Sequence, residues 1–160
     1  MERFNALPSS QAEDRLYACL ANQRWAAAVA AGRPYADLDS LIDKASSEMG
    51  RLTDEEWLAA MRAHPRIGER GGDSPEASAR EQSAAMGASP ETLGALAAEN
   101  LQYEQKFGHV FLIFASGRTG EEILVELRRR MKNDGVTELA EATAELRKIA
   151  RLRLEKLVSP

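Results

Sequence analysis

The sequence contains a single cysteine and only two histidines among its 160 residues. The cysteine, Cys19, has no partner for an internal disulfide, and its place in a helical pattern suits a small buried hydrophobic residue. The histidines, His64 and His109, are far apart and no cysteine pair accompanies them, so the spacing of a metal site is missing. We therefore expect neither a disulfide nor a bound metal.

Long apolar runs and an excess of positive charge are also missing. The longest apolar run, residues 110–115, is much too short to cross a bilayer, and the N-terminus lacks the basic-then-apolar pattern of a signal peptide. The 21 basic residues are interspersed among 25 acidic ones, for a net charge of −4, and form no basic patch for nucleic acid. These absences predict a soluble, cytoplasmic protein with no nucleic-acid or membrane partner.

Most of the chain carries an apolar repeat of helical period, bounded by recognisable caps. Helices are expected over about residues 37–49, 89–107 and 137–157, and another from residue 74 to about residue 86. Capping boxes, in which a side chain at each end of the first turn satisfies a backbone N–H, are predicted at residues 10–13, 53–56 and 119–122.

The apolar run at residues 110–115 has the composition of a strand, but no other segment reads as its partner. An isolated strand cannot satisfy its backbone groups. We therefore predict a buried extended connector, whose N–H and C=O groups could bind a small polar ligand. The fold class is predicted to be all-α, a single domain over residues 1–160 with a bundle of about seven to nine helices.

His64 is the best candidate for chemistry, because it stands where a well-capped helix ends. Pro65 and Gly68 turn the chain directly after it. An imidazole titrates near neutral pH and can therefore act as a general acid or base. The competing interpretation is a histidine that caps the helix C-terminus or donates to water.

A second polar group follows after a short loop. Ser78, Glu81 and Gln82 recur at helical spacing and share one helix face. Glu81 could orient the imidazole and raise its basicity, or the face could anchor a polar substrate, or it could simply be hydrated. Arg118 could bind a carboxylate through two N–H groups, although a surface arginine explains it equally well. His109 is interpreted as structural or pocket-lining.

Several motifs in order carry a family resemblance over nearly the whole chain. They are His-Pro-Arg-Ile-Gly-Glu at 64–69, Ser-x-x-Glu-Gln at 78–82, Asn-x-x-Tyr-x-x-Lys-Phe-Gly at 100–108, Phe-Leu-Ile at 111–113 and Gly-Arg-Thr-x-Glu-Glu-Ile-Leu at 117–124. The sequence resembles the OHCU decarboxylases, enzymes of purine catabolism that convert 2-oxo-4-hydroxy-4-carboxy-5-ureidoimidazoline (OHCU) into (S)-allantoin. The first motif resembles the bacterial form.

The resemblance implies a catalytic histidine at His64, with Pro65 lining the substrate site and Glu81 as a catalytic partner or substrate anchor. Ser78 and Gln82 are the other implied substrate contacts on that helix face. The connector is implied to contact substrate through its backbone at Phe111, Leu112, Ile113, Phe114 and Ala115.

The family's reaction needs no cofactor, because a ring C=N bond beside the carboxylated carbon can take up the electrons left by CO₂. Its members are typically dimeric, so a homodimer is expected. Residues 107–111 read Phe-Gly-His-Val-Phe where many members have Phe-Gly-Phe-Pro-Phe, and Phe114 replaces a small residue or cysteine; both departures affect pocket shape. The alternatives to an enzyme are a helical protein that binds a ureide without turnover and a structural interaction module.

Overall fold

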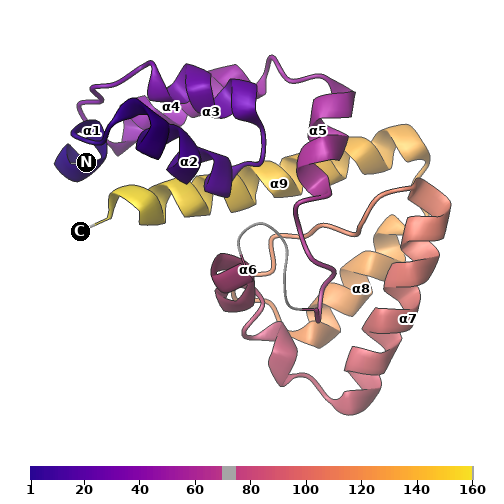
Figure 1. Cartoon of the computed structure of the whole chain (residues 1–160). Helices are drawn as coiled ribbons and strands as arrows, with labels where there is room; N and C mark the ends of the chain where they lie inside the picture. The colour runs from indigo at the N-terminus through magenta and orange to yellow at the C-terminus, as the bar shows by residue number, and fades with distance from the viewer. Residues whose placement is uncertain (70–74, 160) are drawn as a thin grey trace. The chain divides into compact units, whose positions relative to one another are not determined.

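The computed structural model describes residues 1–69 and 75–159 (Figure 1). Within these residues all regular structure is helical, with nine α-helices, one short 3-10 helix and no strand. The all-α prediction with about seven to nine helices is confirmed. None of the described helices is both long and apolar enough to span a membrane.

Residue contacts divide the chain into two compact units, Met1–Ala60 with Arg147–Pro160, and Met61–Leu146. The long helix α9 (Gly135–Val158) contributes residues to both. The single domain over residues 1–160 therefore stays a prediction.

The first unit contains α1 (Glu2–Asn5), α2 (Ser9–Cys19), α3 (Gln23–Ala30), α4 (Leu38–Met49) and nearly all of α5 (Asp54–Met61). Successive helices α2, α3 and α4 pack on one another (Figure 1). Trp25 is buried in the core of this unit, and its indole N–H donates to the Ala45 carbonyl at 3.0 Å. A buried Trp with its polar atom satisfied is typical of a well-ordered core.

Side-chain caps fix most helix starts in this unit. The predicted box at Thr53 and Glu56 is confirmed, with the two side chain to backbone bonds at 3.2 and 2.9 Å. The predicted box at residues 10–13 is wrong: α2 already begins at Ser9, and its N-cap, Pro8, makes no side-chain bond. Proline fixes φ near the helical value, so Pro8 directs the chain into the helix early and Ser10 falls inside the first turn.

The second unit contains α6 (Pro75–Glu81), the 3-10 helix η1 (Ala85–Gly87), α7 (Pro90–Phe107), α8 (Gly120–Arg130) and the first turns of α9. Helices α7 and α8 lie side by side (Figure 1). Ser89 caps α7, and Thr119 and Glu122 form the predicted capping box of α8. A core of aliphatic and aromatic side chains, among them Leu96, Tyr103 and Leu127, fills the space between them.

One predicted helix is shorter than expected. The helix expected to run from residue 74 to about 86 ends at Glu81, and its predicted cap, Ser74, lies outside the described residues. After Glu81 the chain tightens into η1, which packs against the start of α8. A Cβ on Gly120 would lie 2.5 Å from the Ala88 Cβ and 3.1 Å from the Ala85 carbonyl. This close approach requires glycine at the start of α8 and sets the path of the chain after α6.

Candidate active site

The connector between α7 and α8 runs extended, as predicted, and forms neither helix nor strand (Figure 1). Phe111, Leu112, Ile113 and Ala115 are each at most 4% exposed, and Phe114 is half-buried. Because no strand among the described residues pairs with this segment, its backbone groups need other partners or a ligand.

A buried ion pair lies against this connector. Arg130, at the end of α8, is 1% exposed and Glu138, in α9, is not exposed at all. The Arg130 Nε donates to Glu138 at 2.8 Å, and the Tyr103 hydroxyl donates to the same carboxylate. Burial and the bond to Glu138 raise the pKa of Tyr103, which therefore stays a hydrogen-bond donor. Removing one partner of such a pair costs about 3–5 kcal/mol of stability, since the other charge is left buried and unpaired.

Some of the connector's backbone groups are already paired within the protein, two of them with charged side chains. The Leu112 carbonyl accepts from Arg130 Nη1 at 2.5 Å, and the Phe114 N–H donates to Glu145 Oε2 at 2.7 Å. Charged side chains of α8 and α9 thus form the hydrogen bonds that a neighbouring strand would form with these backbone groups in a sheet. Between them, the N–H and C=O of Ile113 have no hydrogen-bond partner in the described part of the chain.

The loop that begins at His64 is held by side chains of α7 and by Gln82, the residue after α6. His64 follows the last turn of α5, is half-buried, and its backbone N–H donates to the Met61 carbonyl at 3.1 Å. Gly68 turns the loop with a φ of +91°, a left-handed conformation that favours glycine. Its N–H donates to Gln82 Oε1 at 2.9 Å, and the Asn100 side chain donates to the Ile67 carbonyl at 3.4 Å.

A charged pair adds a further restraint to this loop. Arg66 donates to Glu104 of α7 through two nitrogens, with the Nη2 contact at 2.8 Å. This arginine lowers the pKa of the Glu104 carboxyl, so the pair stays ionised at neutral pH. The His64 loop is therefore fixed to α7 by one ion pair and one amide.

The polar face of α6 is buried rather than hydrated. This face consists of Ser78 and Glu81 in α6 and of Gln82, the residue directly after its end. The three residues are 5%, 8% and 7% exposed, so the interpretation of a simply hydrated face is wrong. Buried polar side chains are held by partners or bind ligands. The Gln82–Gly68 bond brings this face to the loop that starts at His64. A direct pairing of Glu81 with His64 stays a prediction.

The remaining sequence candidates occupy less central positions. Arg118 lines an open surface hollow with Glu122 and Glu126 of α8, which favours the surface-arginine interpretation. His109 is half-buried, packs its ring edge against Tyr103 with centroids 5.5 Å apart and places Nδ1 3.0 Å from the Val110 carbonyl. These contacts favour the structural one of the two roles expected for His109. Pro65, beside His64, is half-buried.

A small cavity lies behind the His64 loop, a feature that the sequence did not predict. It measures about 240 Å³ and is bounded by residues 66–69 of the loop, by Met86 and by one face of α7. Asn100 lines it and is 1% exposed, and its side-chain oxygen has no hydrogen-bond partner among the described residues. One feature of the sequence could have indicated this cavity: Asn100 is a polar residue on the otherwise apolar stripe of α7 that contains Leu93, Leu96 and Ala97.

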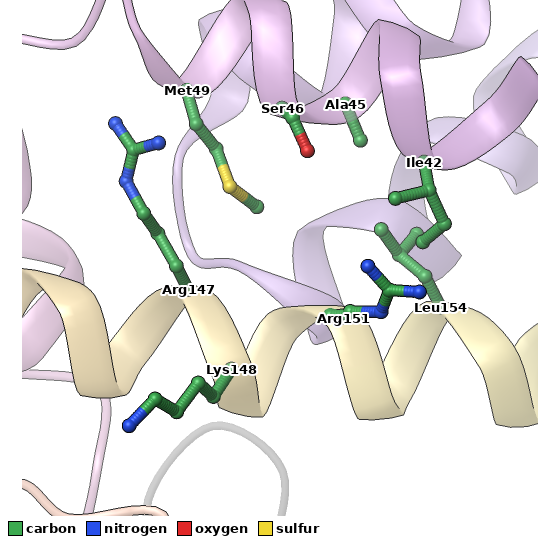
Figure 2. Close-up of a pocket in the computed structure, with 8 residues that line it drawn as sticks. All are labelled: Ile42, Ala45, Ser46, Met49, Arg147, Lys148, Arg151 and Leu154. Carbon is green, nitrogen blue, oxygen red and sulfur yellow. The ribbon is translucent and has the colours of Figure 1, made fainter. Parts of the chain in front are cut away.

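A second hollow, of about 220 Å³, belongs to the first unit and contains none of the predicted site residues. Figure 2 shows it between α4 and α9, with Arg147 and Arg151 directed towards α4 and Lys148 directed away. Arg147 stacks over Trp57 at 5.3 Å and Arg151 pairs with Glu155 at 3.0 Å, so both arginines have structural contacts.

Metal-binding groups are not assembled in the part of the chain that the structure covers: no three His, Cys, Asp or Glu side chains there lie close enough to hold an ion. Gln82 is hydrogen-bonded to the His64 loop, and Ile67 of that loop belongs to the same core cluster as Phe111 and Ile113 of the connector. Groups of these kinds are suited to proton transfer and to hydrogen bonding with a small polar molecule.

Comparison with known proteins identifies relatives of this chain. The family model for OHCU decarboxylase matches residues 5–155. A crystal structure of OHCU decarboxylase in the presence of (S)-allantoin aligns with a TM-score of 0.82 at 34% identity, over 92% of this chain and 99% of that one. The 2-oxo-4-hydroxy-4-carboxy-5-ureidoimidazoline decarboxylase of Xenopus laevis is 32% identical over 80% of this chain and 76% of its own length.

Longer relatives also match. The uric acid degradation bifunctional protein TTL of Arabidopsis thaliana is 33% identical over 92% of this chain but only 47% of its own length. The chain spans about a third to a half of the length of this and two further bifunctional relatives. Since the family model matches nearly all of the sequence, the chain belongs to the OHCU decarboxylase family.

Proposed function

We propose that the chain catalyses the stereoselective decarboxylation of OHCU to (S)-allantoin, a step of urate degradation. The observation that carries this proposal is the buried polar face of α6, hydrogen-bonded through Gln82 to the loop that begins at His64. This hydrogen bond connects the loop of His64, whose imidazole can transfer a proton, with side chains that can bind a ureide. Membership of the family supports the identity of the substrate.

The reaction makes modest demands on the protein. The electrons of the breaking C–COO⁻ bond flow into the neighbouring ring C=N bond, so the substrate supplies its own electron sink. The protein must hold the carboxylate out of the ring plane, manage the proton of the hydroxyl group and deliver a proton to one face of the ring. A positioned imidazole can carry out both proton transfers.

Each site residue takes a role that its position supports. His64 is the acid and base, and Pro65 beside it lines the site. Glu81 either orients the imidazole or accepts hydrogen bonds from the ureido N–H groups, as its neighbours Ser78 and Gln82 also can.

The connector contributes backbone groups, chiefly those of Ile113. Arg118 is retained only as a peripheral carboxylate contact.

The proposal extends to the setting of the enzyme. Residues 1–160 act as a single OHCU decarboxylase-like domain of the bacterial form, without a cofactor, as a homodimer in the cytoplasm. The single cysteine, Cys19, is buried and forms no disulfide, which is compatible with a reducing compartment. Sedimentation equilibrium tests the dimer, and a mass of 17.6 kDa for the species in solution would refute it.

The catalytic proposal is tested by the release of CO₂ from OHCU that is generated in the assay. The substrate also decays unaided, so the rate is measured against protein concentration. The expected result is a rate that rises in proportion to the protein. If the protein binds allantoin saturably yet leaves the rate at the spontaneous value, it is a ureide-binding protein instead.

A further inference from the structure

We propose that Arg130 and Glu145 are positioning residues of the substrate site, which fix the connector so that the backbone groups of Ile113 stay open to the substrate. This inference rests on the proposed function, in which the connector contacts substrate through its backbone. It assigns a role in substrate binding to two charged side chains that touch no reacting atom.

The two side chains bind the connector at Leu112 and Phe114, the residues before and after Ile113. Arg130 donates to the Leu112 carbonyl, and Glu145 accepts from the Phe114 N–H. In an extended chain the N–H and C=O of one residue point to one edge and those of the next residue to the other. The held groups of Leu112 and Phe114 therefore lie on one edge, and the N–H and C=O of Ile113 lie on the opposite edge.

The open edge is where a ligand is needed. Ile113 is 3% exposed, and its two backbone groups have no partner within the described residues. Backbone groups left unpaired in a buried segment are unfavourable unless water or a ligand pairs with them. One donor and one acceptor, a few ångströms apart, match the alternating N–H and C=O groups of a ureide.

Arg130 is suited to hold this position rigidly. Its guanidinium bonds Glu138 and Leu112 at once and stacks over the Phe111 ring, 4.6 Å from its centroid. It therefore touches the connector at two consecutive residues. A lysine has no planar fork and cannot satisfy the carboxylate and the carbonyl in the same geometry.

Four variants test the inference. Glu145→Ala removes the acceptor of the Phe114 N–H, whereas Glu145→Gln keeps an oxygen in the same place. Arg130→Lys keeps the charge but loses the planar fork. The control is Arg128→Lys in the same helix, because Arg128 forms its ion pair with Glu99 of α7 and is largely exposed. Unfolding by urea is measured first, so that kinetics are compared only between folded proteins.

The expected result is a loss of about 10²-fold in kcat/KM for Glu145→Ala, mostly through KM, because small displacements of a binding group have effects of this size. Glu145→Gln should recover most of the loss, Arg130→Lys should act in the same direction as Glu145→Ala, and Arg128→Lys should match the wild type. Hydrogen exchange of the Phe114 amide should become faster in Glu145→Ala and not in Glu145→Gln.

A folded Glu145→Ala with wild-type KM and kcat would overturn the inference, as would a Glu145→Gln as impaired as the alanine variant. If Arg130→Lys does not fold, the two Glu145 variants decide. A wild-type protein without decarboxylase activity refutes the proposed function instead. In that case the exchange rate of the Phe114 amide, which requires no activity, still shows whether Glu145 holds the connector.

Discussion

Glu81→Gln removes one negative charge from the buried face of α6 and hardly changes the shape of the side chain. Glu81 is 8% exposed, so solvent and salt screen its charge only weakly. A hydrogen bond to a charged group contributes about 1.5–3 kcal/mol, which corresponds to about 10- to 150-fold in a binding or rate constant. We expect a loss in kcat/KM within this range.

The kinetic constant that changes distinguishes the two roles of Glu81. If Glu81 anchors the substrate, KM rises and kcat changes little. If it orients His64, kcat falls and the acidic limb of the pH–rate profile moves to lower pH, because the imidazolium loses a stabilising neighbour. We expect mainly the first result, since Ser78 and Gln82 share the same buried face.

The assay is steady-state kinetics on OHCU generated in place, over a range of pH around neutrality. Glu76→Gln is the matched control, because Glu76 belongs to the same helix but is exposed. Unchanged kcat, KM and pH profile in a folded Glu81→Gln would refute the reasoning. The buried face of α6 would then serve only the packing of the second unit.

Three further predictions follow from the same structure. His64→Ala should keep the helical circular dichroism and lose about 10²- to 10⁴-fold in rate, the usual effect of a positioned acid or base; a near-normal rate would remove His64 from the mechanism. Dialysis against EDTA should leave the activity unchanged, and a loss that Zn²⁺ or Mg²⁺ restores would contradict the cofactor-independent proposal. Arg24 and the Thr53 N–H lower the pKa of Glu56 from 4.5 to about 2, so its contribution to stability is present above about pH 4.5 and lost as the pH falls towards 2. Urea unfolding should therefore lose more stability between pH 5 and pH 2 in the wild type than in Glu56→Gln, and equal losses would exclude this role of Glu56.

The helices could be predicted because their signals are local. The capping boxes at Thr53 and Thr119 and the serine cap of α7 each depend on residues within one turn, and all are present. The connector was predicted by a different argument, the lack of any segment to pair with it. Two predictions failed. The box at residues 10–13 failed because Pro8 starts α2 earlier. The length of α6 was overestimated because η1 packs against α8, a tertiary contact that a local sequence pattern does not contain.

The site could be predicted in part. The pattern of residues 78–82 placed three polar side chains on one face, but it could not decide between burial and hydration, because burial depends on tertiary packing. The role of Arg130 was missed because the basic run at residues 128–130 suits a helix C-terminus equally well. A signal was present: Arg130 lies three residues after Leu127 and so falls on the inward stripe of α8, where an unpaired charge would be costly.

The handedness of the allantoin formed tests the central claim most directly. Without a chiral catalyst, decay of OHCU protonates both faces of the ring and gives allantoin without net optical activity. With the wild-type protein, circular dichroism should show (S)-allantoin accumulating at a rate that rises with protein concentration, while His64→Ala should give a product close to racemic. Optically inactive allantoin at every concentration of wild-type protein would contradict the account.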